Sequence, residues 1–320
     1  DEHGTVSFAF QGGEPTVAGL DFFRDFVAMV SAFRPLDRQV SYALQTNGMA
    51  LNEEWTHFLK ENQFLVGLSV DGYRELHDHY RVDTKGEGTY GRVAKALALL
   101  QKFEVETNLL CVVTGQCAKH PQKTYASMKK LGVRYLQFIP CLDPLEEQRG
   151  RAVYSLTPKL YGDFLCGLFD QWYRDWAEGH YTSVRLFDDY VHLAMGEPAS
   201  TCAASGGCGS YFVVEADGGV YPCDFYVLDR WRMGDVHTDS LKQLANDETA
   251  SEFLRQGRLR PSRCASCRWV PLCNGGCRRD WTGGADDTEN YYCESFRRFF
   301  EYAADRIGEI AWQERRSRMR

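Results

Sequence analysis

The sequence predicts an α/β protein in which helices cover the outside of a parallel sheet, either open or closed into a barrel. Through the first half of the chain, apolar runs of strand length alternate with segments of helical periodicity. Five such units in series indicate a parallel sheet. Glycines and polar residues follow the strands at their carboxyl ends, where sheets of this kind carry their chemistry.

Each strand is an apolar run that ends at a turn signal. Residues 5–11 (TVSFAFQ) end at Gly12-Gly13, and residues 40–45 (VSYALQ) end at Thr46-Asn47-Gly48. The other predicted strands are 64–70, 106–114 and 134–142. The predicted helices, with apolar residues at helical spacing, are 20–33, 53–61, 90–103 and 122–131.

The second half of the chain changes character. An aromatic-rich helix at 157–179 has a stripe typical of core packing, and another helix is predicted at 185–195. Residues 211–215 and 220–222 predict a hairpin around a glycine turn. An amphipathic helix at 294–312 precedes a frayed basic tail. The predicted domains are 1–150 for the sheet, 151–200 for a helical connector, 201–293 for a cysteine-rich domain, and 294–320 for the terminal helix and tail.

Cysteines accumulate in the last third of the chain. Eight of the 12 are spaced C-x5-C-x14-C and then C-x2-C-x5-C-x3-C, before a final cysteine. Eight thiolates make two sets of four, the number that a tetrahedral metal ion or an iron–sulfur cluster requires. Neighbouring glycines allow the backbone to fold closely around a compact inorganic group. These candidate metal ligands are Cys202, Cys208, Cys223, Cys264, Cys267, Cys273, Cys277 and Cys293.

Three other interpretations of the cysteines are open. Disulfides suit small secreted chains better than a 320-residue α/β protein without a signal peptide. Two structural zinc sites fit the spacing of Cys264 and Cys267. Inert buried thiols do not explain the clustering, but that interpretation suits the cysteines that stand singly, which are Cys111, Cys117, Cys141 and Cys166.

Charge and hydropathy exclude several classes of partner. The net charge of −7 argues against nucleic acid and anionic membranes. The sequence has no apolar run long enough to span a bilayer and no charged-then-apolar leader at its start. The chain starts at Asp1 without a methionine and enters a strand at once. We therefore expect it to be a piece of a longer, cytoplasmic protein.

Gly12-Gly13-Glu14-Pro15 directly follows the first predicted strand. The glycines allow close approach of the backbone to a ligand, and Glu14 offers a carboxylate to an amine. On their own, these residues also fit a glycine turn followed by an acid that caps a helix.

Together with the cysteine array, this turn resembles the radical S-adenosylmethionine enzymes that carry a SPASM domain. The cysteine spacing followed by Asp224, the run Cys273-Asn274-Gly275-Gly276-Cys277, and Asp71-Gly72 with His77-Asp78 and Arg81 are similar to the anaerobic sulfatase-maturating enzymes. The resemblance covers essentially the whole chain. It implies a partial (β/α)6 TIM-like barrel, its first strand missing, with a C-terminal SPASM domain and a terminal helix.

The resemblance implies S-adenosylmethionine and 4Fe-4S clusters as cofactors. One auxiliary cluster would be held by Cys202, Cys208, Cys223 and Cys277, and a second, interleaved with it, by Cys264, Cys267, Cys273 and Cys293. Glu14 would hold the amino group of S-adenosylmethionine. The full set of implied contacts with this cofactor is Gln11, Gly12, Gly13, Glu14, Pro15, Ser69, Arg81 and Leu142.

Asp224 matches the carboxylate that takes the substrate's proton; a solvated turn acid is the simpler alternative. The family's C-x3-C-x2-C motif, which holds the catalytic cluster, is absent from the sequence. It would precede Asp1, so we expect truncation and no activity of this chain alone.

The implied reaction oxidises a cysteine or serine of a sulfatase peptide to Cα-formylglycine. A radical from S-adenosylmethionine takes a hydrogen from Cβ, Asp224 takes a proton, and a second electron leaves through the auxiliary clusters. The implied partners are a sulfatase polypeptide with Cys/Ser-x-Pro-x-Arg and a flavodoxin- or ferredoxin-like electron donor. A SPASM maturase of another peptide and a non-enzymatic zinc scaffold remain as alternatives.

Overall fold

The computed structural model describes residues 4–33, 38–145, 147–283 and 288–318. The chain divides into two compact units. The first comprises Asp1–Leu156 and Gly167–Arg185, and the second comprises Thr157–Cys166 and Leu186–Arg320. Helix α6 (Pro158–Ala177) therefore contributes residues to both units. Among the described residues, none of the helices combines the length and apolar character needed to cross a bilayer.

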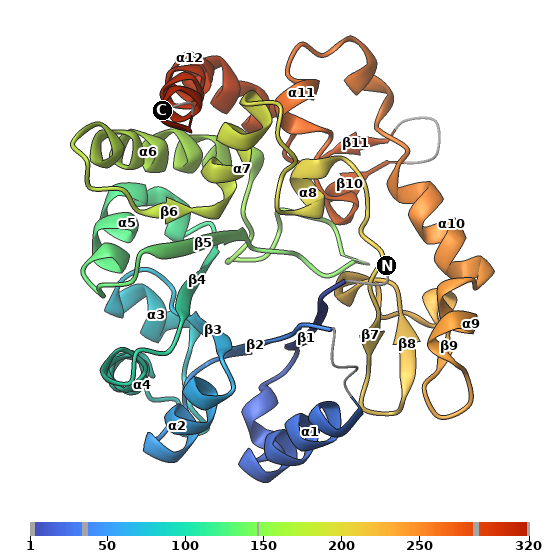
Figure 1. Ribbon diagram of the computed structural model, residues 1–320. Coiled ribbons are helices and arrows are strands. Elements are labelled where there is room, and N and C mark those ends of the chain that lie inside the picture. The colour runs from blue at the N-terminus through green and yellow to red at the C-terminus, as the bar shows by residue number, and fades with distance from the viewer. Residues whose placement is uncertain (1–3, 34–37, 146, 284–287, 319–320) are drawn as a thin grey trace. The chain divides into compact units, whose positions relative to one another are not determined.

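The first unit is built on a six-stranded parallel sheet, which confirms the predicted α/β fold (Figure 1). The strands follow one another in the sheet in chain order: β1 (Val6–Phe10), β2 (Val40–Thr46), β3 (Phe64–Ser69), β4 (Thr107–Val113), β5 (Tyr135–Pro140) and β6 (Ser183–Val184). Five of them were predicted. β6 was not, because a two-residue strand is too short to give a periodic signal.

Helices cover the outer face of this sheet (Figure 1). They are α1 (Leu20–Phe33), α2 (Glu53–Glu61), α3 (Arg74–Tyr80), α4 (Tyr90–Lys102) and α5 (Pro121–Lys129), with the 3-10 helices η1 (Pro15–Ala18) and η2 (Cys117–Lys119). Phe64 of β3 packs against Phe23 of α1 and Phe58 of α2. Because burial alternates along β3, its other face carries Leu65 and Gly67 away from these helices.

Apart from the long terminal helix α12, the second unit is made of short elements. Its helices are α7 (Arg185–Ala194), α8 (Cys202–Ser205), α9 (Leu241–Ala245), α10 (Glu248–Gly257), α11 (Val270–Cys273) and α12 (Cys293–Arg318), with η3 (Asp224–Tyr226), η4 (Asp229–Trp231), η5 (Ser262–Ser266) and η6 (Arg278–Asp280). Its strands are β7 (Val213–Val214), β8 (Gly219–Tyr221), β9 (Gly234–Asp235), β10 (Trp281–Thr282) and β11 (Glu289–Asn290). The predicted hairpin is the antiparallel pair β7–β8, and β9 adds a third strand to it.

The terminal helix is longer than predicted. α12 continues through Arg318, so the prediction of a frayed tail from residue 313 was wrong for the described residues. Side chains of the tail fix the last turns: Arg318 forms an ion pair with Glu197 at 2.6 Å, and Arg315 donates a hydrogen bond to the carbonyl of Met195. The part of the predicted tail at 319–320 lies outside the described residues.

Candidate functional site

Glu14 links the loops that follow β1 and β2. Its Oε1 accepts hydrogen bonds from the Thr16 amide (3.1 Å), the Thr16 hydroxyl (2.6 Å) and the Thr46 hydroxyl (2.7 Å), and its Oε2 accepts from the Asn47 amide (2.6 Å). Glu14 also caps η1, so the helix-cap interpretation holds as well. Among the described residues Oε2 accepts only from the Asn47 amide, so it retains capacity for a further donor, such as an amine.

The two glycines before Glu14 leave room beside the loop. Gly12 and Gly13 have φ of 87° and 51°, a region that residues with a Cβ rarely adopt. A Cβ built at either position would meet no atom of the described residues within 4 Å. The loop thus presents open space next to a carboxylate that several hydrogen bonds hold in place.

Asp71, which follows β3, is held by a second network. Only 4% of the residue is exposed. Its Oδ2 lies 2.6 Å from Arg81 Nε, and its Oδ1 accepts from the Val112 amide at 2.9 Å. This fixes Arg81, a predicted cofactor contact, beside the carboxyl ends of β3 and β4.

His77, on helix α3, is part of the same network. His77 is fully buried, and desolvation lowers the pKa of its imidazole, so the ring is neutral at pH 7. Its Nδ1 accepts from the Asp71 amide, which leaves Nε2 to donate to the hydroxyl of Thr89 at 3.1 Å. That hydroxyl in turn donates to the carbonyl of Arg81 at 2.9 Å. The network therefore fixes the backbone on both sides of the Asp71–Arg81 ion pair.

The remaining predicted cofactor contacts lie at the same edge of the sheet. Gln11 follows β1, Ser69 ends β3, and Leu142 comes two residues after β5. Parallel strands place their carboxyl ends together, so these residues share an edge with Glu14 and Arg81. Their contact with S-adenosylmethionine stays a prediction.

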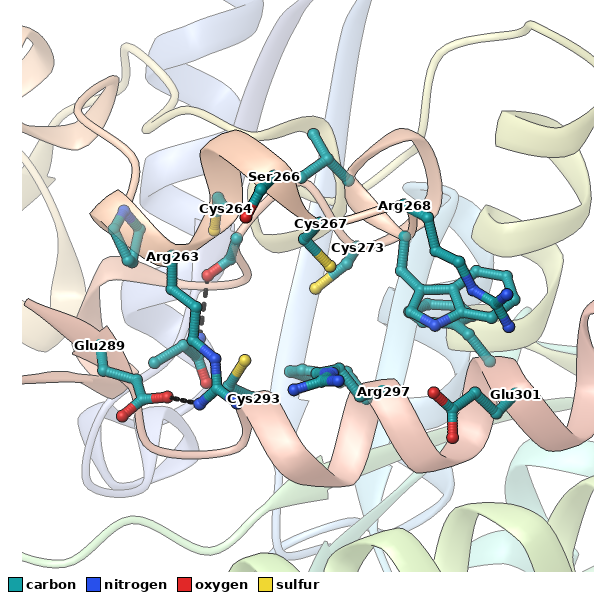
Figure 2. A pocket seen from close by; sticks show the side chains of 17 residues that line it. Arg263, Cys264, Ser266, Cys267, Arg268, Cys273, Glu289, Cys293, Arg297 and Glu301 are labelled. Atoms are coloured by element: carbon teal, nitrogen blue, oxygen red, sulfur yellow. Dashed lines mark hydrogen bonds and ion pairs between the residues drawn. The ribbon is translucent and has the colours of Figure 1, made fainter.

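Four of the eight clustered cysteines line one cavity of about 300 Å³ in the second unit: Cys264, Cys267, Cys273 and Cys293. Figure 2 shows the sulfurs of Cys267 and Cys273 side by side in the middle of this cavity, those of Cys264 and Cys293 nearer to Arg263, and Arg268 at the opposite end. Cys264, Cys267 and Cys273 come from η5, the residue after it and α11, and Cys293 opens α12. The structure thus brings together the four cysteines that the resemblance assigns to one cluster.

The other four cysteines form a second neighbourhood. Cys277 lies within electrostatic reach of Cys202 and Cys223, and Cys208 within reach of Cys202. Cys208 and Cys223 pack against a buried aromatic cluster of Tyr226, Trp231 and Phe253. Arg278 covers these three rings at 4.9–5.2 Å from their centroids. This cation–π contact positions the segment that directly follows Cys277.

Both neighbourhoods fit an inorganic cluster chemically. All 12 cysteines are free thiols, so the structure forms no disulfide from them. Burial raises the pKa of Cys223 to about 11 and that of Cys273 to about 12, and it also raises the pKa of Cys277. These thiols are therefore protonated until a metal replaces the proton.

The first cavity has room for a group larger than one ion. Its volume of about 300 Å³ is bounded by other side chains besides the four thiols, among them Arg263, Trp269 and Phe296. Four thiolates are the ligand set of a 4Fe-4S cluster, and this cavity supplies them.

Asp224, the predicted proton acceptor, opens η3 directly after Cys223. Its Oδ1 lies 3.6 Å from the Cys223 sulfur and accepts a hydrogen bond from the Tyr211 hydroxyl at 3.1 Å. Tyr211 was missed in the sequence, because no spacing rule connects it to a residue 13 positions later. Burial is the main cause that raises the pKa of Tyr211, so its hydroxyl keeps its proton and remains a donor to Asp224.

The four cysteines that stand singly lie outside both sets. Cys111 and Cys117 are fully buried in the first unit, while Cys141 and Cys166 are half-buried. Cys111 lies on β4 with its side chain in the core, which agrees with the prediction of an inert buried thiol.

Both units of the chain contain a segment that matches a known protein family. Residues 1–128 match the model of the Radical SAM superfamily, and residues 206–268 match that of SPASM, an iron–sulfur cluster-binding domain. The chain is 44% identical to a cysteine-type anaerobic sulfatase-maturating enzyme of Clostridium perfringens, over 97% of this chain and 85% of the relative. It is 30% identical to a serine-type enzyme of Bacteroides thetaiotaomicron, over 93% and 76% of the two chains.

The fold is shared with a solved structure described as native anSMEcpe with bound AdoMet and Kp18Cys peptide. The TM-score is 0.93 at 44% identity, covering 97% of this chain and 86% of the other. Similarity of this extent runs through the parallel sheet, the cysteine-rich segments and the terminal helix alike. The chain belongs to the radical S-adenosylmethionine enzymes with a SPASM domain, and within them to the anaerobic sulfatase-maturating enzymes.

Proposed function

We propose that the protein is a cysteine-type sulfatase-maturating enzyme, which converts a cysteine of a Cys-x-Pro-x-Arg segment to Cα-formylglycine. The observation that carries this is the 44% identity to a cysteine-type enzyme over 97% of the chain, against 30% to a serine-type enzyme. The reaction takes place in the cytoplasm, where thiols are kept reduced. It draws electrons from a flavodoxin- or ferredoxin-like donor.

S-adenosylmethionine, when bound beside a reduced iron–sulfur cluster, would supply the radical chemistry that removes a hydrogen atom from the substrate Cβ. Glu14 Oε2 binds the amino group of this cofactor, since the Thr46 and Asn47 donors already fix the carboxylate. Asp71 positions Arg81 beside the cofactor. Asp224 accepts the thiol proton of the substrate while the hydroxyl of Tyr211 orients its carboxylate.

The proposed oxidation removes one hydrogen atom, one proton and one electron from the substrate cysteine. The Cβ–H hydrogen leaves as an atom, the S–H proton goes to Asp224, and one electron leaves toward the auxiliary sites. A carbon–sulfur double bond forms, and hydrolysis then exchanges sulfur for oxygen, giving formylglycine and hydrogen sulfide. The eight clustered cysteines would hold the iron–sulfur groups that can take up this electron.

The full-length protein, purified without oxygen, is expected to convert a Cys-x-Pro-x-Arg peptide at least about tenfold faster than the Ser-x-Pro-x-Arg peptide, because the two differ at the reacting atom itself. Peptide mass spectrometry measures formylglycine, and chromatography measures deoxyadenosine release. A crosslinked peptide in place of an aldehyde would show that the chain modifies peptides in another way. Equal rates on the two peptides would contradict the cysteine-type assignment.

Glu14→Gln is expected to weaken binding of S-adenosylmethionine about 30-fold, on the order of 2 kcal/mol. The glutamine side chain carries no charge. In the wild type both carboxylate oxygens accept hydrogen bonds, from Thr46 and from Asn47, so the NH₂ group of the glutamine would be placed against one of these two donors. Calorimetric titration of the full-length protein with S-adenosylmethionine measures the change. Glu61→Gln is the matched control, an exposed glutamate at the end of α2. Unchanged affinity in Glu14→Gln would remove Glu14 from the binding site.

A further inference from the structure

An arginine-rich stretch borders the cavity lined by four cysteines. From Phe253 to Arg279 the chain carries seven arginines and no acidic residue, although its net charge is −7. Like charges this close in sequence repel one another. The chain has 44 acidic residues, yet none of them lies in this stretch. The concentration of arginines therefore needs a cause other than the average composition.

Some of these arginines have partners that explain them. Arg255 forms an ion pair with Glu252 at 2.7 Å, and Arg263 contacts both Glu289 and Glu294. Arg278 is occupied by the aromatic cluster beside Cys277. Folding of the second unit accounts for these side chains.

Three others are exposed and have no carboxylate partner among the described residues: Arg258, Arg260 and Arg268. Arg260 donates to the neutral Asn274 Oδ1 at 3.1 Å, and Arg268 lies over the Trp269 ring at 4.3 Å. Neither contact neutralises the charge. These cations are therefore available to a partner outside the chain.

An exposed apolar residue accompanies them in the sequence. Leu259 stands between Arg258 and Arg260, and 56% of it is exposed. Arginine is enriched at protein interfaces and lysine is depleted, and Leu259 adds apolar area beside the arginines. We call Arg258, Leu259, Arg260 and Arg268 the arginine rim.

Two members of the arginine rim, Arg260 and Arg268, lie at the cysteine cavity. Arg268 lines the cavity, and Figure 2 shows it at the end opposite Arg263. Arg260 is within electrostatic reach of Cys264, whose thiol also lines the cavity. A protein that bound the rim would therefore sit next to any cluster held there. Because electron tunnelling decays steeply with distance, such a position suits electron transfer.

We propose that the arginine rim docks an acidic electron-carrier protein, a flavodoxin or ferredoxin, against the cluster held by Cys264, Cys267, Cys273 and Cys293. This inference rests on the proposed function, since it needs a cluster at that site. Nucleic acid is the less suitable partner for the same cations. It carries a charge about every 1.7 Å along its axis and requires an extended basic surface. Here the three cations lie between residues 258 and 268 of an acidic chain.

The test uses full-length protein with reconstituted clusters and an acidic flavodoxin as the probe, with binding measured by flavin fluorescence without oxygen. The triple variant Arg258→Gln/Arg260→Gln/Arg268→Gln is expected to bind about tenfold more weakly at low ionic strength. The difference should fall at 0.5 M salt, where screening removes it. Leu259→Ser should weaken binding at both salt concentrations, because apolar contact is not screened by salt.

A matched control removes the same charge elsewhere. Lys85→Gln/Lys95→Gln/Lys130→Gln changes three exposed lysines of the first unit and should leave flavodoxin binding unchanged. The proposal is overturned if the arginine variant binds like the wild type, if the lysine variant weakens binding equally, or if a DNA duplex proves the tighter ligand of the rim.

Two further measurements separate this proposal from the proposed function. Iron and sulfide analysis shows whether each variant holds its clusters, and formylglycine formation with a small chemical reductant does not depend on docking. The arginine variant should keep its clusters and its activity with the chemical reductant, yet lose about tenfold in its rate with limiting flavodoxin. Wild-type protein that forms no formylglycine with the chemical reductant would refute the proposed function, whatever the binding result.

Discussion

Asp224→Asn is expected to reduce formylglycine formation by about 10²- to 10⁴-fold while cleavage of S-adenosylmethionine continues, the range found for loss of a general base. The asparagine keeps the shape of the side chain, and its Oδ1 still accepts from the Tyr211 hydroxyl that holds Asp224. What is lost is the ability to take a proton. Both auxiliary clusters should remain, since Cys223 and its backbone are unchanged.

The measurement pairs two products of one reaction. Deoxyadenosine reports that the radical was generated and quenched, and peptide mass reports whether the substrate was oxidised. A fall in formylglycine with deoxyadenosine preserved separates loss of the base from loss of the radical site. Equal falls in both products would instead place the defect in cofactor binding or in folding.

Asp229→Asn provides the control for Asp224. Asp229 is also exposed and also opens a 3-10 helix, η4, five residues further on. If Asp224 were only a turn residue, the two substitutions would have similar effects of a few tenths of a kcal/mol on stability and none on the reaction. Near wild-type formylglycine from Asp224→Asn would exclude the proton-acceptor role.

The regular elements of the first unit were predictable because local signals agree with tertiary packing. Helix α2 occupies the predicted residues 53–61, where Asn52 caps the first turn by accepting from the Trp55 amide at 2.9 Å. α3 was missed, because its seven residues include two histidines and no apolar stripe. Its position depends on long-range contacts, such as His77 with Asp71, that periodicity does not show.

The sequence predicts which residues are candidates for the site, but it predicts little about how their side chains are held. The sequence indicates that Glu14 offers a carboxylate near a glycine turn, but not that Thr46 and Asn47 would hold it. Those contacts depend on the register of β1 against β2. Likewise, spacing gives eight cysteines in two fours but does not assign them, because assignment depends on how the chain turns between neighbouring cysteines.

The turn between Cys273 and Cys277 shows how the assignment arises. Asn274, Gly275 and Gly276 all have positive φ, of 51°, 88° and 69°. Three successive residues in this region reverse the chain sharply, which glycine permits at low cost. The reversal leaves Cys273 lining the cavity with Cys293, while Cys277 lies near Cys202 and Cys223. Two cysteines four positions apart can therefore serve different clusters.

The variants Cys273→Ala and Cys277→Ala are therefore expected to lose different iron–sulfur clusters. Each variant of the full-length protein should lose about a third of its iron and sulfide, because removing one of four thiolates releases one of its three clusters. Anaerobic alkylation followed by peptide mass mapping then identifies the cysteines that became reactive. Cys166→Ala removes a half-buried thiol outside both sets and should keep both clusters.

The pattern of alkylation decides the assignment. In Cys273→Ala the newly reactive thiols should be Cys264, Cys267 and Cys293, which share its cavity. In Cys277→Ala they should be Cys202, Cys208 and Cys223, its neighbours in the second set. Since each variant keeps the other cluster, the protected set also reports that the unit has folded. Alkylation of Cys277 in the Cys273→Ala variant, with Cys293 still protected, would mean that the C-x2-C-x5-C-x3-C run holds one cluster by itself and that the two sets do not interleave.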